Sequence, residues 1–209
     1  MLFTVYLDVN QEIALVKKTP RAATPGMVSE YKDKVCWVSG IFQADNPDQL
    51  LISRGAKRPC VYFEYLSEYA TYDTDSEGHV DKTWHTSEEI KKLGPIPLTV
   101  RNTEFYIRSD NPRVQGGLEK TLDKQEIRNH IEYRYSEYII PDNSSVWVLG
   151  IPGTDTIGPT EIGIIITMNT PDEYISEQGT TAIVLIVIVV VLLCVAGLFL
   201  GLGIRMIRK

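Results

Sequence analysis

Apolar positions follow two patterns along the chain, one continuous and one alternating with polar residues. The continuous pattern runs from Ala182 to Ile204, 23 residues without a charge, of which 17 are Val, Ile, Leu or Phe. At about 1.5 Å per residue it makes a helix of roughly 35 Å, long enough to cross a hydrocarbon core of about 30 Å. The sequence therefore predicts a transmembrane α-helix over 182–204, followed by a short basic tail over 205–209.

Upstream of this run, short segments rich in β-branched and aromatic residues are separated by turn-forming residues, as is typical of strands. The segments that predict strands are 34–42, 50–53, 60–72, 79–86, 98–107, 131–140, 146–149 and 162–168. Strands dominate, and no regular alternation of strands with helices is present. The fold class expected is therefore mainly β, an antiparallel barrel or sandwich with one or two short helices, plus the C-terminal transmembrane helix.

Two segments carry helix signals. Residues 86–89 (Thr-Ser-Glu-Glu) have the spacing of a capping box, and residues 91–95 (Lys-Lys-Leu-Gly-Pro) supply a basic last turn and a Gly-Pro stop. They predict one short helix between them. Residues 118–129 are polar and charged with a few spaced apolar positions, which predicts a second, exposed helix.

The chain divides into four parts on these patterns. Residues 1–26 are expected to form an N-terminal strand and a linker, because an apolar start is followed by a stretch with two prolines and a glycine. Residues 27–175 form the β domain, 182–204 the membrane helix and 205–209 the tail. The apolar start is interrupted by Asp8 and Glu12 before it reaches the length of a secretory signal.

Charge is distributed unevenly about the apolar run. All 27 acidic residues precede it, whereas three of the 21 basic residues follow it, so residues 1–181 carry a net charge of 18 − 27 = −9. Nucleic acids and anionic surfaces are bound through basic footprints. We therefore expect no nucleic-acid partner.

Few residues offer recognisable chemistry. The chain has three Cys and three His, scattered without metal-ligand spacing. The acidic segment 73–78 opens with the spacing of a calcium loop, but the twelfth position, which should be a bidentate Glu, is Trp84. No nucleophile elbow, Walker sequence or Cys-x-x-Cys is present. We therefore predict no catalytic, cofactor or metal site, while an enzyme that uses unidentified carboxylates remains an alternative.

Two motifs resemble a known family. The first is Arg-Pro-Cys-Val-Tyr-Phe-Glu-Tyr over 58–65; the second is an Arg-x-x-Glu strand over 133–142 that leads through a Pro turn into Val-Trp-Val-Leu-Gly over 146–150. In order and rough spacing they resemble the two halves of a GIDE domain, across about residues 34–170. The residues that match the family motifs are Pro59, Cys60, Val61, Tyr62, Arg134, Glu137, Pro141, Val148, Leu149 and Gly150.

The best-known members of this family are mitochondrial RING-type ubiquitin ligases, in which the GIDE domain sits between two membrane helices and a RING follows. The resemblance implies a GIDE-like β domain over 27–175. A RING holds two zinc ions with four Cys or His ligands each, more than the three Cys and three His of this chain. We therefore expect no ligase activity from this chain alone. The alternative is a ligase-family component whose RING is absent or supplied in trans.

The matching residues also have simple physical roles. Pro59 sets the backbone before a strand, and Cys60 is expected to be a small buried apolar side chain. Arg134 and Glu137 are three residues apart, so in a regular strand they point to opposite faces. Either a bulge lies between them or each has its own partner, and a structural role is expected. Gly150 is expected to close its strand before a turn.

The sequence thus predicts a single-pass membrane protein that acts as a partner-binding or regulatory module, with the lipid bilayer and an unidentified protein as partners. A structural anchor of a membrane complex is an alternative, because Gly197 and Gly201 form a Gly-x-x-x-Gly pair suited to a homodimer. The basic tail favours a cytoplasmic tail by the positive-inside rule. No secretory signal was recognised that would export some 180 residues, which favours the opposite orientation. We therefore expect the β domain in the cytoplasm.

Overall fold

The computed structural model describes residues 12–109, 111–180 and 184. By contacts the chain divides into two units, one over residues 21–168 and one made of the segments on either side. In the second unit, residues 12–18 and 171–180 are helical. The Tyr174 hydroxyl donates a 2.6 Å hydrogen bond to the Glu12 carboxylate and so joins these two helices.

The unit over residues 21–168 is mainly β, which confirms the fold class at that level. Its strands are β1 (Arg21–Ala22), β2 (Cys36–Phe42), β3 (Leu51–Ile52), β4 (Pro59–Cys60), β5 (Tyr62–Thr74), β6 (Val80–Leu93), β7 (Leu98–Val100), β8 (Thr103–Ile107), β9 (Arg113–Val114), β10 (Glu119–Arg128), β11 (Ile131–Ile140), β12 (Ser144–Pro152), β13 (Thr156–Gly158) and β14 (Ile165–Thr167). Helix α2 (Pro25–Glu30) and the 3-10 helix η1 (Pro47–Gln49) are its helical segments among the described residues.

Five strands form a closed ring of pairings in the order β2-β7-β8-β13-β12, because β12 pairs back with β2. The closing pair is antiparallel and runs from Ser144 opposite Phe42 to Gly150 opposite Cys36. We call these strands the five-strand ring; β1, β14 and β9 extend the same sheet. Closure leaves the ring strands without a long unpaired edge. The sheet is mixed rather than antiparallel as expected, since β1–β2, β13–β8 and β14–β9 are parallel pairs.

The core of this unit lies at the ring. Phe42, Val38, Leu98, Val148 and Ile157 are fully buried and belong to one apolar cluster. On β2 the three consecutive residues 36–38 are all buried, so both faces of this strand are covered there. Strands that are covered on both faces lose the alternating pattern.

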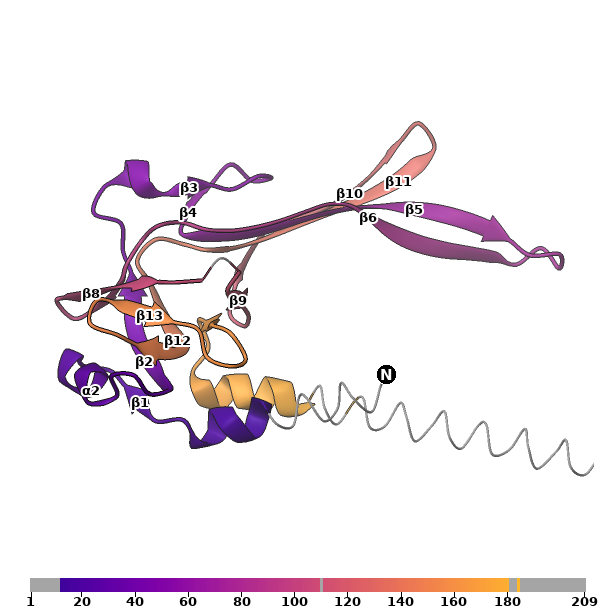
Figure 1. The fold of residues 1–209 in the computed structure, drawn as a ribbon. Helices are drawn as coiled ribbons and strands as arrows, with labels where there is room; N and C mark the ends of the chain where they lie inside the picture. The colour runs from indigo at the N-terminus through magenta and orange to yellow at the C-terminus, as the bar shows by residue number, and fades with distance from the viewer. Residues whose placement is uncertain (1–11, 110, 181–183, 185–209) are drawn as a thin grey trace, which may run out of the picture. The chain divides into compact units, whose positions relative to one another are not determined.

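A separate antiparallel sheet is built from two long hairpins in the order β10-β11-β5-β6. β5 pairs with β6 from Tyr62 opposite Leu93 to Thr74 opposite Val80. Figure 1 shows the two hairpins running together away from the ring strands. The first residues of β5 are buried and its last four are exposed, so the sheet has a covered inner half and an exposed outer half. Its edge strands are β6 and β10.

Both predicted helices of the β domain are wrong. The segment with the capping-box spacing lies inside β6, and residues 119–128 form β10. The local signals are each worth about 1 kcal/mol, which is less than the pairing of a whole strand with its neighbour contributes. The linker expected up to residue 26 is wrong in part as well, because α2 begins there with Thr24 as its N-cap.

Several expectations fall on residues outside those described. They are the N-terminal strand, the transmembrane helix over 182–204 apart from Val184, the Gly197 and Gly201 pair, and the tail over 205–209. Among the residues that are described, none of the helices is long and apolar enough to span a bilayer.

Candidate functional site

The Arg-x-x-Glu motif lies on β11, where its two charged residues point to opposite faces. The register of β11 against β5 is continuous from Tyr133 to Ile140, so no bulge separates Arg134 from Glu137. Each residue has its own partner, as one of the two expected arrangements required. The motif therefore builds two different sites, one on each face of the four-stranded sheet.

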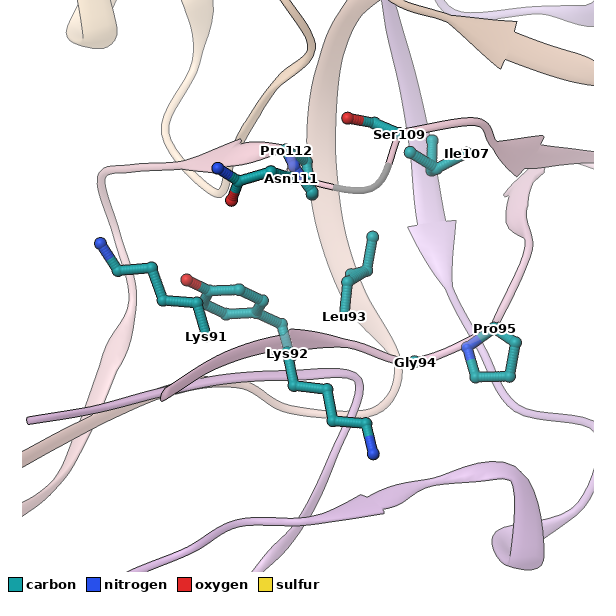
Figure 2. Close-up of a pocket in the computed structure, with 10 residues that line it drawn as sticks. Lys91, Lys92, Leu93, Gly94, Pro95, Ile107, Ser109, Asn111 and Pro112 are labelled. Atoms are coloured by element: carbon teal, nitrogen blue, oxygen red, sulfur yellow. The ribbon is translucent and has the colours of Figure 1, made fainter. Parts of the chain in front are cut away.

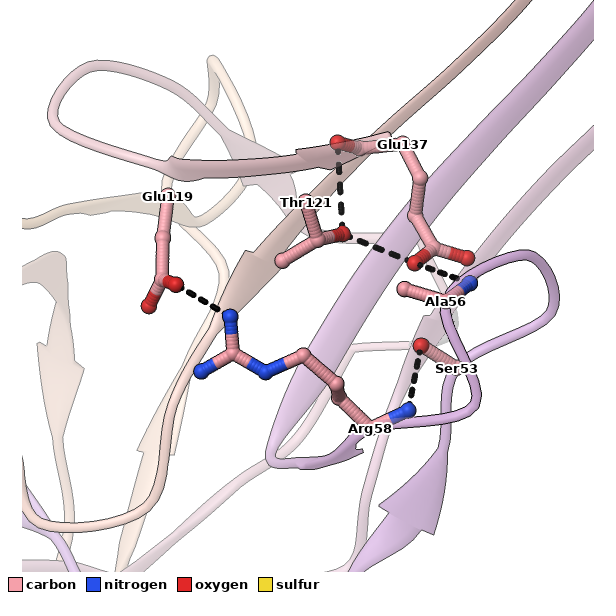
Figure 3. Close-up of polar contacts among 6 residues, drawn as sticks. All are labelled: Ser53, Ala56, Arg58, Glu119, Thr121 and Glu137. Carbon is pink, nitrogen blue, oxygen red and sulfur yellow. Dashed lines mark hydrogen bonds and ion pairs between the residues drawn. The ribbon is translucent and has the colours of Figure 1, made fainter. Parts of the chain in front are cut away.

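Glu137 is fully buried and fastens a loop to the sheet. Its carboxylate accepts hydrogen bonds from the backbone N–H of Gly55 and of Ala56, and from the Thr121 hydroxyl at 2.8 Å. Figure 3 shows the carboxylate between Thr121 and the loop over 53–58, which joins β3 to β4. Glu137 is thus a structural anchor for this loop.

The loop sequence suits this close approach. A Cβ on Gly55 would lie 2.7 Å from a methyl of Leu122 and 3.1 Å from the Glu137 carboxylate. Only glycine allows the backbone so near without displacement. At the other end of the loop, the Arg58 N–H donates to the Ser53 hydroxyl at 3.0 Å, and the Arg58 guanidinium pairs with Glu119 of β10 (Figure 3).

Two opposing effects determine the ionisation of Glu137. Burial by itself raises the pKa of this carboxyl, but the hydrogen bonds from Gly55, Thr121, Ala56 and Ser53 outweigh it, and the pKa is lowered from its ordinary value. Glu137 is therefore an anion at neutral pH. A carboxylate whose oxygens are already occupied by these donors is poorly placed to act as a general acid or base.

Arg134 belongs to a cluster on the opposite face, in the outer half of the sheet. Its guanidinium pairs with Glu68 of β5, the residue directly opposite in the register, and lies 4.3 Å from the ring centre of Trp84. The Lys82 ammonium lies over the same ring at 4.5 Å. Two cations, the Arg134 guanidinium and the Lys82 ammonium, thus lie against the Trp84 ring, and the cation–π interaction stabilises both charges.

The cluster extends to the neighbouring hairpin through Glu132. This carboxylate accepts hydrogen bonds from the Tyr72 hydroxyl at 2.6 Å and from the Lys82 ammonium at 2.7 Å. Hydrogen bonds from Lys82 and Tyr72 lower the pKa of Glu132, and the hydrogen bond from Arg134 lowers that of Glu68. We call the set the Trp84 surface; it consists of Glu68, Tyr72, Lys82, Trp84, Glu132 and Arg134.

The reverse face of the outer half is also aromatic. Tyr69 and His85 stack with ring centres 5.2 Å apart, and Tyr133 stacks with Tyr135 at 6.4 Å. The imidazole of His85 is hydrogen-bonded to the Thr71 hydroxyl at 2.8 Å. Both faces of the outer half therefore present aromatic rings at partly or fully exposed positions.

The remaining motif residues are structural. Cys60 is fully buried, as expected, and burial raises the pKa of its thiol to about 11. Val61 extends the pairing of β5 with both of its neighbours, because its N–H donates to the Ile140 carbonyl and its own carbonyl accepts from the Gly94 N–H. Pro59 begins β4 and Tyr62 begins β5. The motif segments over 59–62 and 134–141 are adjacent because β5 pairs with β11.

The expectation that Gly150 closes its strand is wrong. β12 continues to Pro152, and Gly150 lies inside it, opposite Cys36. A Cβ at this position would lie 2.3 Å from a methyl of Ile157 and 2.9 Å from the Gly158 carbonyl oxygen. Glycine is therefore required by the close packing of β12 against β13, not by a turn. Val148 and Leu149 are fully buried beside it, and Pro141 follows the end of β11.

The histidines and cysteines of the described segments do not assemble into a metal site. No group of three or more His, Cys, Asp or Glu suited to a metal occurs in the part of the chain that the structure describes. The calcium-like segment consists of the end of β5 and the exposed turn between β5 and β6, where the Asp75 carboxylate accepts from the N–H groups of Glu77 and His79. His130 lies in the tight turn between β10 and β11 with a φ of 65°.

An open pocket of about 320 Å³ lies beside the start of the sheet, between the end of β6 and the segment after β8. Figure 2 shows Leu93 and Ile107 lining it, while the Lys92 side chain extends away. Lys91 is paired with Glu64 at 3.2 Å and Glu89 at 2.9 Å, so its charge is compensated. The described lining of the pocket thus offers no uncompensated charge from Lys91 to a ligand. The Trp84 surface is the better candidate site.

Comparisons of the chain with protein-family models, with curated proteins and with solved structures give no match. Of the Trp84 surface, the sequence motifs identified Arg134 but none of the other five members as site residues. The sequence does place Glu68 and Tyr72 an even number of residues apart on one strand, and Lys82 and Trp84 likewise on the other. Residues so spaced lie on the same face of their strand, which could have pointed to a common surface. The mistaken helix near residue 86 and the unknown register kept that signal hidden.

Proposed function

We propose that this protein is a membrane-anchored binding module whose Trp84 surface recognises another protein. The observation that carries the proposal is the composition of this surface, in which Trp84, Arg134 and Tyr72 gather on an exposed sheet. Trp, Tyr and Arg are the residues most enriched at the centres of protein interfaces. The outer half of the sheet adds little to the core, so its aromatic residues call for another role.

The charges of the surface favour a protein over other partners. Two cations, Lys82 and Arg134, alternate with two carboxylates, Glu68 and Glu132, so the surface has no net charge. A phosphate backbone or an anionic headgroup layer requires an excess of positive charge. A protein surface with its own mixed charges can match this pattern and obtain its orientation from it.

The membrane part of the proposal rests on the sequence. The uncharged run over 182–204 has the length of a spanning helix. The GIDE-like motifs support the same assignment by resemblance, since that domain occurs in membrane proteins. The engagement of the Glu137 carboxylate by a loop favours the binding module over an enzyme that uses this residue.

Site-specific photo-crosslinking in intact membranes tests the proposal. A photoreactive phenylalanine analogue replaces Tyr72, which is 52% exposed, or as a matched control Tyr106 of β8, which is 48% exposed. We expect a crosslink to a different protein from position 72 and none from position 106. Arg134→Ala should reduce the crosslink from position 72 at least tenfold, because Trp84 loses a cation that orients it.

Equal crosslinking from the two positions, or only self-crosslinks from position 72, would contradict the proposal. The yield of folded protein serves as the control for Arg134→Ala. The ion pair with Glu68 is solvent-exposed on the Arg134 side, so its loss leaves the fold intact.

A further inference from the structure

The edge of β6 that pairs with no other strand of the described residues carries a self-complementary charge pattern. β6 is an edge strand of its sheet, and residues 88–92 read Glu-Glu-Ile-Lys-Lys. Reversed and opposed to itself, this pentapeptide places each Glu opposite a Lys. We propose that two copies of this chain pair through the β6 edge as an antiparallel dimer, with the two-fold axis at Ile90. The proposal is independent of the Trp84 surface and goes beyond it.

The geometry of antiparallel pairs selects this centre. Residues directly opposite each other lie on the same face of a sheet, so a two-fold axis between identical strands must pass through a residue position. A centre at Glu89 would set that residue opposite its own copy, and a centre at Lys91 would do the same for the lysines. A centre at Ile90 sets Glu89 opposite Lys91 and Glu88 opposite Lys92, so four opposite-charge pairs form across the axis.

A bulge limits the pairing segment to the same residues. In the register of β5 with β6, Ser67 faces Glu88 and Glu68 faces Thr86, which leaves Ser87 as an extra residue of β6. Bulges disturb an edge and oppose its pairing with another strand. The edge available beyond Ser87 therefore starts at Glu88, and the strand ends at Leu93.

The side chains involved are accessible. Glu88, Glu89 and Lys91 have side-chain exposures of 38%, 51% and 45%. Their present partners are weak surface contacts, such as Arg54 with Glu88 at 3.4 Å. In the dimer, Lys91 exchanges the Glu89 of its own strand for that of the other copy. An isologous pair of short strands is a small interface, so we expect a weak dimer whose register is determined by charge.

Charge reversal in the full-length protein in detergent tests the dimer. Glu88→Lys with Glu89→Lys makes the segment uniformly basic, and Lys91→Glu with Lys92→Glu makes it uniformly acidic. Each double variant alone should bind itself at least tenfold more weakly than the native chain in sedimentation equilibrium. A mixture of the two double variants should form heterodimers, and the fourfold swap should restore self-association.

A cysteine placed at the axis gives a second, geometric readout. Opposed Cα atoms in an antiparallel pair are about 4.5–5.5 Å apart, within the range that a disulfide spans. With Cys194 replaced by Ala in every variant, Ile90→Cys should form a disulfide-linked dimer under mild oxidation. Thr83→Cys is the control on the same strand, because its copies would lie roughly 45 Å apart in this register.

The outcomes are distinct. Self-association that neither double variant weakens overturns the proposal and points to the predicted helix with Gly197 and Gly201. Equal disulfide yields at positions 90 and 83 overturn the register. Neither result bears on the crosslink to a different protein from position 72, so the two proposals fail separately.

Discussion

The five-strand ring and the four-stranded sheet come from interleaved segments of one chain, yet they bury their residues to different extents. In the ring, Phe42 and Ile157 have no exposed surface. In the outer half of the sheet, Val80 and Ile127 are 59% and 75% exposed. Burial of apolar side chains stabilises the folded state. The ring therefore contributes more to the free energy of unfolding than the outer half of the sheet does, whereas the outer half exposes side chains that can contact other molecules.

Side-chain truncation gives the largest expected contrast between these regions. Phe42→Ala should lower the free energy of unfolding by about 3–5 kcal/mol, because it removes a fully buried aromatic ring from the core. Ile127→Ala in β10 should change it by less than about 0.5 kcal/mol. Urea denaturation of both variants measures the difference. Similar losses would show that the outer half contributes to the core after all.

The buried carboxylate of the sheet gives the next largest effect. Glu137→Gln replaces one of the two carboxylate oxygens by an NH2 donor, which then faces the N–H donor of either Gly55 or Ala56, and we expect a loss of about 2–3 kcal/mol. Glu119→Gln is the matched control, since it weakens an exposed ion pair with Arg58 and should have a much smaller effect. If the two variants were equally stable, Glu137 would not hold the loop.

The contribution of the Glu137 carboxylate to the free energy of unfolding depends on pH. Its pKa is lowered in the folded protein, so its stabilisation is complete above the ordinary Glu pKa, about 4.3, and is lost as the pH falls through the lowered pKa. The difference in unfolding free energy between the native chain and Glu137→Gln should be constant near pH 7. It should shrink below about pH 4. If the difference in unfolding free energy grew as the pH fell, the pKa of Glu137 would be raised in the folded protein rather than lowered.

Glycine replacement compares the packing of the two regions. Gly150→Ala in the ring brings a methyl against Ile157, a stiff β-branched residue, and against the Gly158 carbonyl, so we expect a loss of about 1–3 kcal/mol. Gly55→Ala meets first the flexible end of Leu122 and should cost less. Thermal unfolding ranks the two variants. The reverse order would place the tighter packing in the loop.

The two buried cysteines report on local opening of each region. Cys36 belongs to the ring cluster and Cys60 to the smaller cluster of the sheet, and burial raises the pKa of both thiols to about 11. Because their thiolate fractions are similar, alkylation rates compare access. We expect Cys60 to react roughly tenfold faster, which corresponds to about 1.4 kcal/mol in opening free energy. Peptide mass spectrometry separates the sites, and equal rates would mean that both regions open together.

The local sequence pattern predicted several strands correctly. The segments around β2, β5, β11 and β12 were predicted from β-branched and aromatic residues, and all four are strands. The burial of Cys60 also followed from residue type. For the Arg-x-x-Glu motif the period left two arrangements open, and the continuous register of β11 with β5 decided for separate partners. The strands and the burial of Cys60 depend on a few neighbouring residues, which is why the sequence alone contained them.

Tertiary structure decided the properties that depend on pairing. The ring closes because β12 meets β2 some 100 residues earlier in the chain, and no local signal encodes that contact. The register of β5 with β6 turned an apparent capping box into part of a strand and gathered Trp84, Lys82 and Glu68 on one face. Short-range helix signals contribute about 1 kcal/mol, and a long run of cross-strand partners outweighs them.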